Sequence, residues 1–147
     1  MKIWVDADAC PGVVKNILFK ASDRTRVELA IVANHPMKIP QRNYIKFLQV
    51  SPGFDEADNR ILELLDKGDL VITADIPLAA QVLEKGGYAL NPRGHLYSKE
   101  SIQEQLKMRE FKESLRDSGI DTGGPAAMNQ KNTSNFANHL NKWLSNI

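Results

Sequence analysis

The chain has 147 residues, of which 42% are hydrophobic and 25% are charged. This length favours one domain around one hydrophobic core, and the composition excludes an intrinsically disordered chain. Its 19 Lys and Arg residues nearly balance 18 Asp and Glu residues, so the formal charge of +1 excludes a strong overall attraction to nucleic acid. Any basic surface must be local.

The sequence predicts a cytoplasmic protein that does not enter membranes. It has no apolar run long enough to cross a bilayer, and Asp6 and Asp8 interrupt the first apolar segment too early for a secretory signal. Cys10 is the only cysteine, which excludes an internal disulfide and a multi-cysteine metal cage. A reducing compartment fits this cysteine usage.

Hydrophobic periodicity predicts strands and helices that alternate along the first 97 residues. In chain order these are a strand at 3–5, a helix at 11–21, strands at 27–33 and 44–50, a helix at 55–66, a strand at 70–73, a helix around 79–83 and a strand at 88–90. Parallel neighbours need crossover connections. We therefore expect an α/β fold with a doubly wound, mainly parallel sheet and helices on both faces.

Beyond residue 97 the pattern becomes helical and more charged. A helix is predicted at 99–116, and the residues expected to cover the sheet are Ile102, Leu106, Met108, Phe111 and Leu115. A polar loop at 121–133 then precedes an amphipathic helix that carries Phe136, Leu140, Trp143 and Leu144. We predict one domain over 1–147, with an α/β core at 1–97 and a C-terminal helical appendage at 98–147.

Aspartates gather where α/β sheets bind their ligands, at the carboxyl ends of the strands. Asp6 and Asp8 follow the first strand, and Asp75 closes the strand at 70–73, so these carboxylates converge if the two strands are neighbours. Asp58 shares the apolar stripe of its helix, and an inward carboxylate needs a partner. Clustered carboxylates suit Mg²⁺ or Mn²⁺, which assist phosphodiester hydrolysis.

Purely structural roles compete with this interpretation. Asp8 and Asp75 precede helices and can act as N-caps, although a proline at the first position of each helix would leave both aspartates upstream of the cap. For Asp58 the alternative is a contact with the helix dipole, and for Asp6 it is a solvated position at the sheet edge. Asp55 is interpreted as a helix cap.

Other polar residues near the predicted strand ends receive weaker assignments. Asn34 and Arg93 follow strands that can end at the same edge, where an amide and a guanidinium would contact a phosphate, although ordinary loop roles are favoured for both. Asp69 is interpreted as a turn residue. Cys10 is interpreted as a small buried residue, and the three histidines lack metal-ligand spacing and are predicted at the surface.

Four ordered motifs resemble the bacterial YaiI/YqxD family, and the turn Thr-Gly-Gly-Pro at 122–125 fits it as well. The motifs are Val-Asp-Ala-Asp-Ala-Cys-Pro at 5–11, Gly-Phe-Asp-Glu-Ala-Asp-Asn at 53–59, Asp-Leu-Val-Ile-Thr-Ala-Asp-Ile-Pro-Leu-Ala at 69–79 and Leu-Asn-Pro-Arg-Gly at 90–94. That family is similar to PIN-like nucleases, so the resemblance implies a PIN-like sheet with an acidic Mg²⁺ or Mn²⁺ site.

The resemblance implies catalytic and metal-binding roles for Asp6, Asp8, Asp58 and Asp75. Thr73 belongs to the Thr-x-Asp end of its strand, and it joins Asn34 and Arg93 as an expected substrate contact. PIN-like domains carry a single acid after the first strand. The doubled aspartate at 6 and 8 therefore leaves open which carboxylate would bind metal directly.

The sequence thus favours a divalent-metal-dependent nuclease or phosphodiesterase that acts on RNA, with a homodimer left open. A haloacid-dehalogenase-type phosphatase is the second enzyme hypothesis, because an Asp-x-Asp can supply nucleophile and acid, although Cys10 replaces the customary hydroxyl residue. A noncatalytic RNA- or nucleotide-binding module is the third. Its phosphate path would use the local cations Lys38, Arg42, Lys46 and Arg93.

Overall fold

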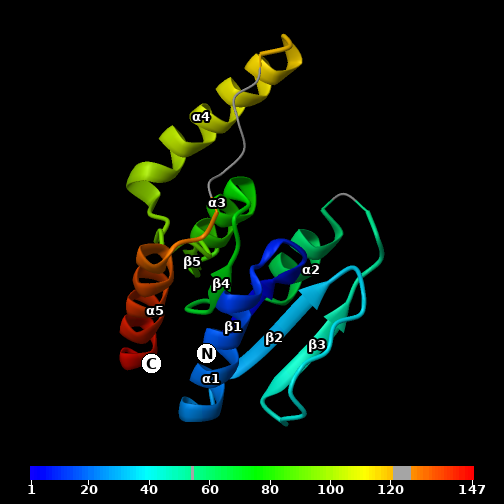
Figure 1. The fold of residues 1–147 in the computed structure, drawn as a ribbon, viewed down its shortest axis with the longest axis vertical. Coiled ribbons are helices and arrows are strands. Elements are labelled where there is room, and N and C mark those ends of the chain that lie inside the picture. The colour runs from blue at the N-terminus through cyan, green and yellow to red at the C-terminus, as the bar shows by residue number, and fades with distance from the viewer. Residues whose placement is uncertain (54, 121–126) are drawn as a thin grey trace.

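In a computed structural model that describes residues 1–53, 55–120 and 127–147, a parallel sheet lies between two layers of helices (Figure 1). The strands are β1 (Lys2–Asp6), β2 (Glu28–Ala33), β3 (Ile45–Gln49), β4 (Leu70–Ile72) and β5 (Tyr88–Leu90). The helices are the 3₁₀ turn η1 (Ala7–Ala9), α1 (Gly12–Thr25), α2 (Glu56–Leu64), α3 (Ile76–Glu84), α4 (Lys99–Asp117) and α5 (Gln130–Ser145). The predicted α/β class and element order are confirmed.

The central strand of the sheet is β1. The strand order is β3-β2-β1-β4-β5, and every neighbouring pair is parallel. The chain winds outward from β1 to β3, returns to place β4 beside β1, and continues to β5. The winding direction therefore reverses between β1 and β4, where Val5 pairs with Ile72 and the two following segments begin side by side.

Alternating side chains give the sheet two apolar faces. Ile3 and Val5 point to the face covered by α1 and α5, whereas Trp4 points to the face covered by α2, α3 and the start of α4. Phe136 and Leu140 of α5 are 0% and 1% exposed. Helix α5 is therefore part of the core. Within the described residues, none of the helices combines the length and apolarity that spanning a bilayer requires.

Helix α4 covers less of the sheet than its sequence suggested. Ile102 is buried, but Met108 and Phe111 are 54% and 59% exposed. The reason is length, since the 19 residues of α4 run well past the nine-residue α3 against which the helix packs. Figure 1 shows the far half of α4 projecting from the body of the protein. The prediction that its whole apolar stripe lies on the sheet is wrong.

Helix α5 begins inside the segment that was predicted as a loop at 121–133. Asn129 is the N-cap, and its side chain accepts a hydrogen bond from the Asn132 backbone N–H while the Asn132 side chain accepts one from the Asn129 backbone N–H. Two asparagines thus form the reciprocal cap usually made by Ser or Thr with Glu. The turn predicted at 122–125 lies outside the described residues.

Asp69 connects β1 to β4 at the end of the sheet opposite the acidic residues. Its side chain accepts hydrogen bonds from the Lys2 backbone N–H, the Trp4 indole N–H and the Asp66 backbone N–H, each at 3.0 Å. The residue is only 2% exposed. It is therefore a buried carboxylate with three donors, and the interpretation as a simple turn residue is incomplete.

We expect Asp69→Ala to lower the free energy of unfolding by about 3 kcal/mol, because the substitution leaves buried N–H donors without an acceptor. Urea unfolding followed by tryptophan fluorescence measures the change. The matched control is Asp117→Ala at the exposed end of α4, which should alter stability by less than about 0.5 kcal/mol. Equal stability losses in the two variants would contradict the role of Asp69.

Candidate functional site

A cavity of about 230 Å³ opens beyond the carboxyl ends of β1 and β4. Among the described residues its lining includes Asn34, Gly53 and Ala57 and six carboxylates, which are Asp6, Asp8, Asp55, Glu56, Asp58 and Asp75. No Lys or Arg belongs to this described lining. The cavity therefore concentrates negative charge in a small volume and favours a positively charged occupant.

The four aspartates that the sequence singled out all line this cavity. They come from three separate parts of the chain: the end of β1 with η1, the first turn of α2, and the residue before α3. The strand order brings these parts together because β4 lies directly beside β1. Convergence is thus a property of the fold, and the chemical roles of the four side chains remain predictions.

Thr73 links the ends of β1 and β4. Its hydroxyl donates to Asp6 Oδ2 at 2.9 Å and accepts from the Asp75 backbone N–H at 3.0 Å. Burial raises the pKa of Asp6, the hydrogen bond from Thr73 opposes that rise, and the charges of Asp75 and Asp8 add to it. Thr73 is 1% exposed and therefore acts on the cavity through the Asp6 carboxylate that it holds.

Asp75 is the N-cap of α3. Its Oδ1 accepts from the Leu78 backbone N–H at 3.0 Å, and the helix begins at Ile76 with Pro77 in its first turn. The sequence argument that the proline would leave Asp75 upstream of the cap is wrong by one residue, because proline is tolerated at the second position as well as the first. Asp75 therefore has a structural role in addition to its place in the cavity.

Asp58 has the most strongly shifted pKa among the carboxyl groups of the cavity. Its pKa is raised to about 7, first by burial, then by the charges of Asp75 and Asp6, by its hydrogen bond with Asp75, and by the charge of Asp55. A position in the first turn of α2 would by itself favour the charged form. Repulsion and burial outweigh the helix dipole here, so Asp58 is half protonated near neutral pH and then donates to Asp75.

Asp8 joins the end of β1 to the end of β2. Both of its oxygens accept from the Asn34 backbone N–H, at 3.2 and 2.9 Å, and Oδ1 lies 2.7 Å from His35 Nδ1. The alternative that Asp8 caps α1 is wrong, because Pro11 occupies that N-cap. His35 is at the surface as predicted, but its contact with Asp8 was not foreseen, since the sequence assigned His35 no partner at this edge.

Arg93 is not among the described residues that line the cavity, and its expected contact with a substrate stays a prediction. Its backbone N–H donates to Asn91 Oδ1 at 2.8 Å within a tight turn. Gly94 ends this turn at φ +92°, and a Cβ atom there would lie 2.5 Å from the Asn135 Cβ atom. The motif at 90–94 therefore serves the close packing of α5.

Two cavity acids were missed because their side chains were assigned elsewhere. Asp55 occupies the N-cap position of α2, as interpreted, yet it has φ +65° and makes no capping hydrogen bond. Aspartate tolerates this left-handed conformation better than most residues. Glu56 lies off the apolar stripe of its helix, so helical periodicity alone would place it toward solvent. The loop that starts α2 carries both carboxylates to the cavity, and helical periodicity cannot predict such a loop.

The donor chemistry of the cavity fits a hard divalent cation, because carboxylate oxygens are the ligands that Mg²⁺ and Mn²⁺ prefer. The geometry is not that of a closed cage. Across residues 1–53, 55–120 and 127–147, no group of three or more His, Cys, Asp or Glu side chains is arranged to hold a metal ion. Binding of a cation by three carboxylates would therefore require rotation of side chains, such as separation of Asp58 from Asp75.

Comparisons with known proteins place the chain among uncharacterised bacterial proteins. A family model described as "Uncharacterized BCR, YaiI/YqxD family" matches residues 4–146. A "UPF0178 protein" of Syntrophotalea carbinolica is 63% identical over 99% of this chain and 98% of its own length. Relatives from Yersinia enterocolitica and Pectobacterium carotovorum are 58% and 57% identical over 98% of this chain and 95% and 96% of their own. No solved structure matches significantly.

The raised pKa of Asp58 predicts that stability falls as pH rises. The unfolded chain releases this proton near pH 3.9, whereas the folded protein holds it up to about pH 7. The contribution of Asp58 is therefore fully present below about pH 4 and is lost between pH 4 and 7. We expect a loss of about 1 kcal/mol over this range, since solvent screens the half-buried group.

Urea unfolding of wild type and Asp58→Asn between pH 4 and 8 measures this loss. The variant should lose less stability than the wild type as pH rises. The matched control, Glu63→Gln on the exposed side of α2, should follow the wild-type curve. A wild-type slope that persists in Asp58→Asn would show that other groups cause the pH dependence.

Proposed function

The chain belongs to the YaiI/YqxD family, and we propose that it is a divalent-metal-dependent nuclease or phosphodiesterase that acts on RNA with Mg²⁺ or Mn²⁺. The observation that carries this proposal is the meeting of Asp6, Asp58 and Asp75 at the point where the winding of the sheet reverses. Ligands of α/β sheets bind at such points. The raised pKa of Asp58 adds a group that can exchange a proton near pH 7.

A divalent cation is part of the proposal because of charge. A phosphodiester is an anion, and six carboxylates line the described part of this cavity without a Lys or Arg among them. Such an anion would be repelled unless positive charge lay between it and the acids. When bound, Mg²⁺ or Mn²⁺ supplies that charge and stabilises the phosphoryl oxygens as the bond breaks.

The residues of the chain take distinct parts in this proposal. Asp6, Asp8, Asp58 and Asp75 are the proposed ligands, and Thr73 fixes the direction of the Asp6 carboxylate by its 2.9 Å hydrogen bond. Asp58, whose pKa is about 7 without a cation, would lose its proton as the cation binds and would then act as a ligand. The Asn34 backbone N–H holds the Asp8 carboxylate in place by a 2.9 Å hydrogen bond.

A neighbouring basic hollow supports RNA as the substrate class. Lys15 of α1 and Lys38 line it together with His35, which contacts Asp8 of the acidic cavity. A nucleic acid strand that enters the acidic cavity could place its flanking phosphates beside these cations. The path expected from the sequence differs, because Arg42 pairs with Asp23 at 3.2 Å and Lys46 lies beside another hollow, against β1 and β2.

The phosphatase alternative has less support. Cys10, which stands where the hydroxyl residue would be, is 7% exposed and packs in the core. Burial raises its pKa to about 12, although Lys15 opposes the rise, so the thiol stays neutral. The interpretation of Cys10 as a small buried residue is confirmed, and a role in acid–base or nucleophilic chemistry is disfavoured.

We expect the purified wild type to cleave unstructured RNA in the presence of Mn²⁺ and to lose this activity with chelator. Asp6→Asn and Asp75→Asn should each lower the rate by about 100-fold or more, because each removes a charge that holds the cation. Gel analysis of labelled RNA measures the rate. Asp117→Asn on α4 is the matched control and should cleave at the wild-type rate.

Several outcomes would contradict the nuclease proposal. Cleavage that survives chelation, or equal cleavage by wild type and Asp75→Asn, would point to a contaminating nuclease. Tight RNA binding in chelator without turnover would favour the noncatalytic module. Hydrolysis of a phosphomonoester with a phosphoryl group trapped on Asp6 would favour the phosphatase.

Metal binding can be tested without activity. Mn²⁺ should raise the melting temperature of the wild type by several degrees, and more at pH 8 than at pH 5, because protons compete for the same carboxylates. The double variant Asp6→Asn/Asp75→Asn should show little of this effect, whereas Glu63→Gln should show all of it. A Mn²⁺ shift that is equal in all three proteins would place the ion elsewhere.

A further inference from the structure

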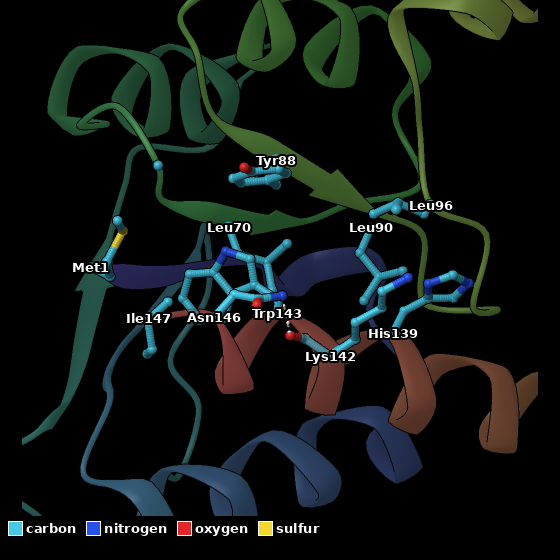
Figure 2. Close-up of a pocket in the computed structure, with 11 residues that line it drawn as sticks. Met1, Leu70, Tyr88, Leu90, Leu96, His139, Lys142, Trp143, Asn146 and Ile147 are labelled. Carbon is cyan, nitrogen blue, oxygen red and sulfur yellow. Dashed lines mark hydrogen bonds between the residues drawn. The ribbon is translucent and has the colours of Figure 1, made fainter.

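A second cavity, of about 260 Å³, lies between β5 and α5 and shares no lining residue with the acidic cavity (Figure 2). Leu70 of β4 and Leu90 of β5 contribute side chains from the same face of the sheet. Trp143 of α5 borders the cavity on one side and Tyr88 on another. The cavity is therefore mostly hydrocarbon and aromatic.

This cavity exists because α5 covers the centre of its sheet face better than the edge. Phe136 and Leu140 of α5 are 0% and 1% exposed, whereas Trp143 in the last turn is only partly buried. Tyr88 and Leu90 are two residues apart in the edge strand β5, so their side chains lie on the same face of the sheet. Tyr88 is nevertheless 51% exposed. The hydrophobic core thus stays open along this edge.

Exposed apolar side chains concentrate around the opening. Among the described residues, eight large hydrophobic side chains are exposed, and four of them line this cavity: Met1, Tyr88, Leu96 and Ile147. Scattered exposed apolar residues are normal, but a contiguous group around a hollow marks a binding surface. The water that they contact would be released by an apolar occupant.

The side-chain charge around the cavity is positive. Lys142 is the charged side chain in the described lining, His139 lies one helical turn before it on α5, and no Asp or Glu belongs to that lining. Figure 2 shows both side chains extending from α5 toward Leu90 and Leu96, whereas Met1 and Ile147 lie at the other end. The cavity thus has a cationic end and an apolar remainder.

We infer that this cavity binds a small amphipathic anion. An aliphatic chain or aromatic ring would lie on Leu70, Leu90 and Trp143, and its acidic group would contact Lys142 and His139. The volume of about 260 Å³ suits a ligand smaller than a typical drug, because pockets for drug-sized ligands measure about 300 Å³ or more.

A pair of amphiphiles with the same tail and opposite charge tests this inference. Decanoate and decyltrimethylammonium, both below their micelle concentrations, are titrated into the full chain by calorimetry and by Trp143 fluorescence. Decanoate should bind once per chain and about tenfold more tightly than the cationic amphiphile, since only the anion meets Lys142 and His139 favourably.

Variants separate the contribution of the charged end to ligand binding from that of the apolar side chains. His139→Gln/Lys142→Gln should weaken decanoate about fivefold and remove most of its advantage over the cation, because neither side chain is buried and solvent screens both. Tyr88→Ser should weaken both amphiphiles to a similar degree. The matched control, Lys131→Gln at the exposed start of α5, should leave both affinities unchanged.

Three results would overturn the inference. Equal or tighter binding of the cationic amphiphile would remove the charge argument, and unchanged decanoate affinity in His139→Gln/Lys142→Gln would place the ligand elsewhere. A dimer in sedimentation that excludes decanoate and dissociates in Leu96→Asp would assign the cavity to a second copy of the chain. Because the two cavities share no residue, none of these results depends on whether the protein cleaves RNA.

Discussion

Repulsion between carboxylates at the ends of β1 and β4 is the constraint on which the acidic site depends. The strand order places Asp6 and Asp75 beside each other, and the first turn of α2 brings Asp58 to the same cavity. Hydrogen bonds relieve part of the repulsion: Thr73 donates to Asp6, and the first turn of α3 donates to Asp75. The repulsion that is left, together with burial, raises the pKa of Asp58, which keeps its proton up to about pH 7. In the folded chain, either a proton on Asp58 or a bound cation would therefore reduce the repulsion between these carboxylates.

Asp69 shows what a purely structural aspartate looks like in the same sheet. It is more deeply buried than any acid of the cavity, yet three N–H donors surround it at 3.0 Å. Asp58 is less buried, but the one hydrogen bond that shifts its pKa is shared with another carboxyl group. The number of donors, more than the degree of burial, therefore separates an aspartate that ties strands together from one that is available for chemistry.

The sequence predicted most of the fold because each strand and helix carries its own periodicity. It also predicted that Asp58 points inward, since its place on the apolar stripe of α2 depends only on helical geometry. It did not predict that Asp55 and Glu56 line the cavity, because a positive φ at Asp55 turns the start of α2 in a way that no periodicity records. It also did not reveal that Gly94 lies against α5, because that contact joins residues far apart in the chain. The projection of α4 depends on the shorter α3, which the sequence of α4 alone cannot reveal.

The net charge of +1 describes this protein poorly, because the two signs are separated in space. Six acids line the described part of one cavity without a Lys or Arg, while Lys15 and Lys38 line the hollow beside it. Lys142 and His139 mark one end of an apolar cavity that no Asp or Glu side chain of the described chain lines. Fields from such groups act over about one Debye length, which is about 8 Å at physiological salt, so each cavity presents its own sign to a ligand. A balanced composition therefore excludes a long-range attraction to nucleic acid, but it does not exclude local recognition of a cation, a phosphate or an amphipathic anion.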